Sequence, residues 1–399
     1  MKRQLCSVVL AGVVVCGTQA WATDGINLIG LGPVQKGTAG AGVAAGGDST
    51  WLILNPAALA NIERGVDASL EVFAPNRSID STVSGGAGKQ NDDSMFVIPS
   101  ISASFGCCHS DRGYLGLGLY GTSGMGVDYD QGRIGADTDG DMMPDMAQGM
   151  GDTMTELSVA KLTAVYAYSF DNDLQVGIGP VAVLSRLKMD MFNGMGFGTG
   201  DWDTSTGIGG IVGVQKQLGA VGLGVSYLSE QSMEEFGEYE TALPDSLNFP
   251  QQATAGIALH LSDNVMLALD YQWIDWEGTD TFGDRFGWDS QSIVKAGVTY
   301  GATDALTLRG GVSHGNSPID ADNAFSNALF PAIMETHVAC GATYQLETIS
   351  INVAYVHAME ETVTANGNDM AAQGMGNMGA GTEISMYQNT LTLGVGYKF

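Results

Sequence analysis

The chain is poor in basic residues, with 16 Lys and Arg against 44 Asp and Glu, a formal net charge of -28. So acidic a protein is not expected to bind nucleic acid or an anionic lipid surface through its overall charge. Beyond position 22 it also lacks any run of about eighteen apolar residues, which excludes a helical membrane protein. A transmembrane β-barrel is still compatible with the sequence, because its strands alternate apolar and polar residues and need no long apolar run.

Cysteine is scarce too: after position 22 the chain has Cys107, Cys108 and Cys340. An odd number leaves at least one thiol unpaired in an oxidising compartment, so no disulfide scaffold is expected and the state of each thiol is left open. The Gly-x-Ser-x-Gly match at 311-315 and the Gly-x-Gly-x-x-Gly match at 116-121 lack the helix that such motifs require. We therefore expect no enzyme, with an outer-membrane lipase or protease as the alternative.

The N-terminus predicts export. Lys2 and Arg3 precede an apolar stretch and an Ala-x-Ala site ending at Ala22, which is the order of a secretory signal peptide. Cleavage after Ala22 removes two cations and no acid, so the charge moves from -28 to -30. A lipoprotein at Cys16 is the less favoured alternative, because the preceding residue is not small.

From about residue 65 onward, segments of alternating character are separated by turn residues, a pattern typical of transmembrane strands. In one of them Val294 and Val298 fall on a face suited to lipid and Lys295 on a face suited to a lumen. The chain ends on an aromatic residue, Phe399, as strands recognised by the outer-membrane assembly machinery do. The predicted fold is all-β, an antiparallel barrel of about 14 transmembrane strands; a soluble all-β domain is the alternative. The predicted strands cover 65-77, 94-106, 113-127, 156-170, 174-192, 204-218, 219-236, 249-261, 264-278, 288-300, 304-314, 335-346, 347-363 and 384-399.

Residues 23-64 do not alternate; they are rich in Gly and Ala and end in Asn55, Pro56 and Ala57. Small residues allow compact packing inside a barrel, which predicts a plug. Together with Phe96-Val97-Ile98-Pro99 and the aromatic terminus, this order resembles the FadL-type family (OmpP1/FadL/TodX), outer-membrane transporters of long-chain fatty acids and hydrocarbons. The resemblance covers the mature chain, so that a hatch over 23-64 and a barrel over 65-399 are expected after the signal peptide over 1-22.

In such a family the ligand is captured at the outer loops and leaves sideways, by passive diffusion, through a kinked third strand. Gly121, Gly124 and Gly126 crowd the third predicted strand, where they favour bulges. Pro99 on the neighbouring strand has no N-H to complete the ladder. The lateral opening is therefore predicted between Pro99 and the stretch from Tyr120 to Gly126; relief of crowding against the hatch is the alternative role of these glycines.

Long-chain fatty acids are the expected ligands, with uncharged aromatic or aliphatic hydrocarbons, or a general porin, as alternatives. A carboxylate requires a cation, and cations are few in this chain. The resemblance implies a carboxylate-binding arginine on the strand that holds Arg186 and Lys188. Lys295 and Arg309 have inward parity on neighbouring strands, so all four are candidates. Pairing with acidic side chains in the lumen is the alternative role of each. The other expected partners are the surrounding outer-membrane lipid and lipopolysaccharide.

One long link carries acidic residues at alternating positions, with oxygen ligands spaced as calcium prefers. It resembles the calcium loops of thrombospondin-type repeats, and a solvated acidic loop is the alternative. The same link and the stretch 370-378 are rich in Met, which suits a first apolar contact with ligand. The candidate calcium ligands are Asp137, Asp139, Asp141 and Asp145.

Overall fold

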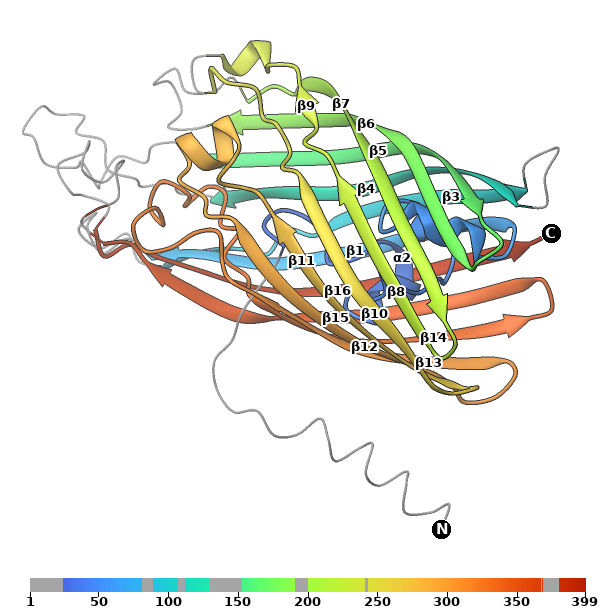
Figure 1. Cartoon of the computed structure of the whole chain (residues 1–399). Coiled ribbons are helices and arrows are strands. Elements are labelled where there is room, and N and C mark those ends of the chain that lie inside the picture. The colour runs from blue at the N-terminus through green and yellow to red at the C-terminus, as the bar shows by residue number, and fades with distance from the viewer. Residues whose placement is uncertain are drawn as a thin grey trace, which may run out of the picture.

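The computed structural model describes residues 24–80, 89–106, 112–129, 153–190, 200–240, 243–366, 368 and 380–399. In these residues fourteen long strands and two short ones form one antiparallel sheet. The sheet closes because β1 (Gly65–Asp80) pairs with β16 (Glu383–Lys398) along its whole length (Figure 1). This confirms the predicted 14-stranded barrel. Among the described residues, no helix has the length and apolar character needed to cross a membrane.

The remaining elements follow one another around the barrel in chain order, except that the short strands β2 and β9 pair only with β1 and β7. The predicted signal peptide, Cys107, Cys108 and the acidic stretch 137-145 lie outside the described residues. The other elements are β2 (Lys89–Asp92), β3 (Phe96–Gly106), β4 (Gly113–Tyr129), β5 (Thr153–Ser169), β6 (Leu174–Asp190), β7 (Asp203–Leu218), β8 (Val221–Leu228), β9 (Ser232–Met233), η3 (Gly237–Tyr239), β10 (Gln252–Ser262), β11 (Val265–Ile274), η4 (Asp280–Arg285), β12 (Gln291–Gly301), β13 (Leu306–Gly315), β14 (Thr336–Leu346) and β15 (Ile349–Thr364).

Alternation along each strand decides which side chains face lipid and which face the lumen. On β12, Val294 and Val298 are exposed on the outer wall, whereas Ile293 and Lys295 are buried inside. The two faces predicted for this strand are therefore confirmed. Cys340 on β14 is also exposed on the outer wall, as a free thiol.

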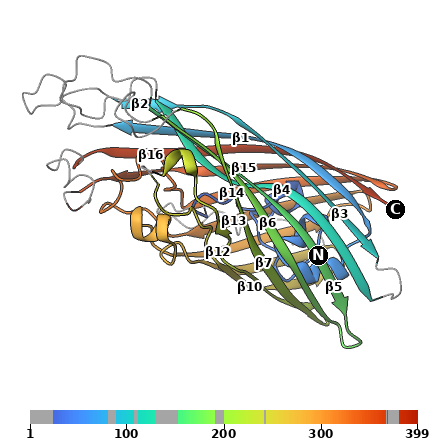
Figure 2. The same cartoon turned by 90° about the horizontal axis from the view of Figure 1, so that it is seen from above.

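Three short helices of the N-terminal segment lie inside the barrel, toward the end that holds the C-terminus (Figures 1 and 2). They are α2 (Gly32–Lys36), η1 (Ser49–Leu52) and η2 (Pro56–Ala60), and most of their residues are buried. Asn55 caps η2 by accepting a hydrogen bond from the Ala57 amide, and its own amide nitrogen donates to the carbonyls of Val43 and Val214. The Asn55-Pro56-Ala57 motif thus starts a helix and ties the plug to β7.

Charged contacts also bind the plug to the wall. Lys36 forms an ion pair with Glu71 of β1 at 2.9 Å, and Asp24 forms one with Lys295 of β12 at 2.7 Å. All four side chains are at most 5% exposed, so each charge depends on its partner for stabilisation. The Asp270 carboxylate adds two bonds from backbone amides of the plug.

Glycine in the wall makes room for this motif, which gives a first prediction. A Cβ at Gly213 would lie 2.0 Å from Oδ1 of Asn55. Gly213→Ala should therefore displace the plug, raise ion conductance in planar bilayers, and cost about 1–3 kcal/mol. Gly237→Ala is the control, because a Cβ there meets nothing within 4 Å. Equal conductance of the two variants would contradict this view of the motif.

Candidate functional site

The barrel wall is interrupted between β3 and β4. Their pairing runs from Gly106 opposite Tyr114 only as far as Ser100 opposite Tyr120. Beyond Tyr120, β4 continues to pair with β5 through a bulge at Gly121/Ser123, while the rest of β3, including Pro99, pairs with β1 alone. The residues singled out from the sequence therefore lie on the two edges of a separation; that a ligand leaves through it remains a prediction.

The plug supplies hydrogen bonds to the edge of β4 that β3 leaves free. The amide of Leu28 donates to the carbonyl of Thr122 at 3.0 Å, and the amide of Gly124 donates to the carbonyl of Ile26 at 3.2 Å. The Ser123 hydroxyl also donates to the side chain of Asn27. Backbone groups inside a membrane protein need such partners, so the plug and the interrupted wall stabilise each other.

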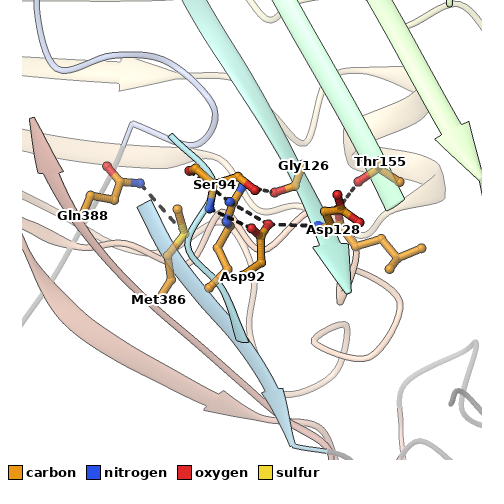
Figure 3. Close-up of polar contacts among 9 residues, drawn as sticks. Asp92, Ser94, Gly126, Asp128, Thr155, Met386 and Gln388 are labelled. Atoms are coloured by element: carbon orange, nitrogen blue, oxygen red, sulfur yellow. Dashed lines mark hydrogen bonds and ion pairs between the residues drawn. The ribbon is translucent and has the colours of Figure 1, made fainter. Parts of the chain in front are cut away.

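A polar network closes the separation at its outer end (Figure 3). Arg77 of β1 forms an ion pair with Asp92 of β2 at 2.6 Å and donates to the carbonyl of Gly126 at 2.5 Å. Asp92 also accepts from the amides of Ser94 and Asp128, both at 2.9 Å. The gap is thus bounded by the Asp92-Asp128 contact at one end and the Ser100-Tyr120 pair at the other; we call it the wall opening.

A cavity of about 600 Å³ runs from the lumen into the wall opening. Its lining is mostly apolar, and it includes plug residues as well as residues of the outer wall, such as Leu119 and Leu184. The cavity therefore connects the lumen with the lipid-facing surface. On the lumen side it is lined by Ile26, Leu28, Ile29, His337 and Val356, and at the opening by Phe96, Ile98, Pro99, Gly121, Gly124 and Gly126.

The basic side chains on the inner side of the cavity are already neutralised. Lys36 and Arg77 both line it, and their partners are Glu71 and Asp92. Among the described lining residues, Arg186 is the one other Lys or Arg. The Nδ1 atom of buried His337 has no hydrogen-bond partner. The inner part of the cavity is thus an apolar space with paired charges at its edge.

The structure corrects the placement of Arg186 and Lys188. Both were expected to face the lumen, but the inward positions of β6 are taken by Leu187 and Met189, which are buried in the main apolar cluster. Arg186 is exposed on the outer wall and lies 4.4 Å from the ring centroid of Trp202. Alternation along the strand correctly placed the two cations on one face, but it did not show whether that face is inside or outside the barrel.

Lys295 and Arg309 do face inward, and both contact or approach the plug. Lys295 holds Asp24. Arg309 packs on Gly37 and donates to Thr343, and it lies near Asp48 of the plug. Burial, together with the neighbouring Asp67 carboxylate, raises the pKa of Asp48 to about 7, and Arg309 opposes this shift. Neither cation lines the cavity while the plug is in place.

Pairing with an acidic side chain in the lumen was the alternative role given for Lys295, and the structure shows that pair, but sequence reasoning did not name Asp24 as the partner and missed the Lys36-Glu71 pair. Lys36 is the one basic residue between positions 23 and 63, and a lone cation in a segment expected to be buried was a usable signal for a buried partner. The role of Asp24 had no such signal, because its partner lies 271 positions away.

A closed antiparallel barrel with an internal plug and an opening in its side defines a membrane transport channel. The chain matches the family model of "Outer membrane protein transport protein (OMPP1/FadL/TodX)" over residues 13–399 and belongs to that family. It is therefore an outer-membrane protein, a channel of the class that carries hydrophobic compounds, as predicted. Transport, not catalysis, is the family's described role.

Solved structures share this fold at low identity. The toluene transporter TodX of Pseudomonas putida aligns with a TM-score of 0.70 and 17% identity, covering 93% of this chain and 99% of its own. A FadL homologue of Pseudomonas aeruginosa gives 0.70 and 16%, covering 94% and 100%. A "47 kDa outer membrane protein" of Pasteurella multocida (strain Pm70) is 27% identical over 129 residues, 29% of this chain; the match spans 29% of that relative.

The Asp24-Lys295 pair yields a second prediction. Asp24→Asn leaves a buried ammonium without its partner, which should cost about 3 kcal/mol, the lower end for such pairs, because Asp270 stands opposite Lys295 on the next strand. Removing both charges, in Asp24→Asn/Lys295→Met, should restore most of this loss. The measurement is the temperature at which the heat-modifiable folded band disappears from a denaturing gel. Equal transitions for Asp24→Asn and wild type would refute the anchoring role.

Proposed function

We propose that this protein admits hydrophobic compounds through the outer membrane by passive diffusion, with exit sideways through the wall opening. The observation that carries the proposal is the apolar cavity that runs from the lumen to the lipid-facing wall. An apolar solute gains about 0.8 kcal/mol per methylene on leaving water. It therefore needs a route past the polar headgroups of the outer leaflet. Its delivery into lipid needs no energy source.

Aromatic side chains pack together near the extracellular ends of the strands. Trp276, Phe282 and Trp288 form a cluster with ring centroids 4.8–5.0 Å apart, built from the link that contains η4. Phe286 and Phe330 stack at 5.6 Å beside it. Trp276, Phe282 and Trp288 are at most 1% exposed, so they stabilise this link by packing, and capture of a ligand at the outer loops remains a prediction. The Met-rich stretches expected to help lie mostly outside the described residues.

Long-chain fatty acids are the ligand we favour, and Lys295 is the proposed carboxylate partner. Asp24 already places a carboxylate on Lys295, at 2.7 Å, and the residues that follow it, Ile26 and Leu28, line the cavity. Withdrawal of this N-terminal segment would free both the cavity and the cation. A ligand carboxylate would then replace the carboxylate of Asp24. Because Lys295 would not be left unpaired, the free-energy cost of the exchange would be small.

Uncharged hydrocarbons are the second candidate, supported by a different observation. Lys36 and Arg77 are paired before any ligand arrives, so the cavity itself offers no free cation among its described inner residues. A neutral aromatic or aliphatic compound would fit without breaking either pair. TodX of Pseudomonas putida, one structure with this fold, is described as a toluene transporter.

Blocking the wall opening gives a third prediction. Gly121 lies on β4 next to the Ser100-Tyr120 pair that bounds the opening, and a Cβ there would already approach Cγ2 of Ile98 to 2.3 Å, so Gly121→Phe should fill the opening. Uptake of radiolabelled oleate and toluene by cells carrying this variant should fall to the level of cells without the barrel. The control is Gly310→Phe on β13, where a Cβ meets its nearest atom at 3.8 Å. Uptake unchanged by Gly121→Phe would refute the lateral route, and rapid entry of a small sugar through wild type would show a porin.

The two ligand classes are separated by a fourth prediction. If fatty acids are the ligand, Asp24→Asn/Lys295→Met should reduce oleate uptake and leave toluene uptake unchanged, because only oleate carries a carboxylate. Lys161→Met is the matched control; Lys161 is a buried lumen cation that donates to Gln231 and does not line the cavity. Equal uptake of oleate by wild type and the double variant would favour uncharged ligands.

A further inference from the structure

Arg186 and Lys188 project from the outer wall immediately above its apolar band. Going up β6, Ile178 is 60% exposed and Leu184 is 45% exposed, both on the outward face. The next outward residue is Arg186, and its neighbours across the sheet are polar: Ser158 on β5 and Thr204 on β7. The apolar band therefore ends between Leu184 and Arg186, which places the two cations at the level of lipid headgroups.

The tight link between β5 and β6 lies at one end of the barrel. Arg186 and Lys188 lie near the other end, which is the end with the long links (Figure 1). The adjoining leaflet is therefore the outer one. Trp202 precedes β7 and is 40% exposed on the same wall, with its ring under the Arg186 guanidinium. An aromatic ring at this depth is typical of a membrane interface, and the stacked geometry holds the cation in place.

Both cations are available to a ligand. Neither Arg186 nor Lys188 takes part in an ion pair of the described residues. The acidic groups on this face are Glu156, opposite Lys188 on β5, and Asp190; Glu156 lies close enough to both cations for them to act on its charge. Two cations spaced two positions apart on one strand face suit an anion with several oxygens.

Few other cations of this acidic protein are so placed. Within the described residues, Lys36, Arg77, Lys161 and Lys295 are buried in the lumen. Arg285 lies in the link with η4 and pairs with Asp245, and Lys89 lies on the short strand β2. Arg64, Arg112, Lys216 and Lys398 lie at the other end of the barrel. The exposed Arg186 and the half-buried Lys188 thus form a local exception, at the outer-leaflet border, to the overall negative charge of -28.

We propose that Arg186 and Lys188, supported by Trp202, bind a phosphate group of an outer-leaflet lipid beside the mouth of the wall opening. Arg186, Glu156 and Leu184 line the outer part of the cavity, so a lipid anchored here has its acyl chains against the lipid-facing edge of the opening. The outer-leaflet lipid would then form one side of the exit. A hydrophobic solute would pass from protein to acyl chain without contact with water.

The test measures lipid binding to the purified full-length barrel in detergent, by native mass spectrometry, with bisphosphorylated lipid A as the probe. Loss of each charge near a lipid phosphate is worth about fivefold in binding. Arg186→Gln and Lys188→Gln should each lower occupancy about fivefold and the double variant about twenty-fivefold, while Trp202→Leu lowers it to a lesser extent. The control is Arg64→Gln/Arg112→Gln, which removes two exposed charges at the opposite end of the barrel.

Three results would overturn the proposal. Lipid A stripped of its phosphates could bind as well as the intact lipid, the control double variant could lose as much binding as Arg186→Gln/Lys188→Gln, or inorganic phosphate alone could displace the lipid at equal concentration. The last result would identify a site for free anions. Because the assay contains no transported solute, its failure leaves the proposed uptake function untouched, and failure of the uptake tests leaves this site standing.

Discussion

Every backbone N-H and C=O within a membrane must find a partner inside the protein, and the rest of this structure depends on that constraint. A barrel meets it by closing, here through the full pairing of β1 with β16. An opening in the wall leaves backbone groups of β4 without a partner strand. These groups need hydrogen bonds from another part of the protein. The plug supplies them when Ile26 and Leu28 bond to β4 at Thr122 and Gly124.

This solution couples the plug to the opening. The same short segment that pairs with β4 begins at Asp24, which is held by Lys295 on the opposite part of the wall, and it also fills the lumen side of the cavity. Any movement of the segment toward an open state therefore exposes β4 groups, frees a buried cation and enlarges the cavity together. The energy for such a movement has to come from a ligand that offers both apolar contact and a substitute for lost polar contacts.

The sequence was sufficient for the strands, because period-two alternation follows directly from burial of one face. It was also sufficient for the edges of the wall separation, since Pro99 and the glycines after Tyr120 act through local backbone chemistry. It failed for Arg186, because alternation groups residues by face without naming the face, and above the lipid band a charged residue is tolerated outside. It was silent on Asp24, whose partner is set by the closed fold and not by any local pattern.

The outward position of Arg186 changes how the acidity of this chain is understood. A net charge of -28 argues against binding to anionic lipid only if charge is spread evenly. Here Lys36, Arg77 and Lys295 each pair with an acid of the plug or wall, whereas Arg186 and Lys188 at the lipid border take part in no described ion pair and act locally, within a Debye length of about 8 Å. At that range the sign of the nearest charges weighs more in the binding of an anion than the net charge of the whole chain does.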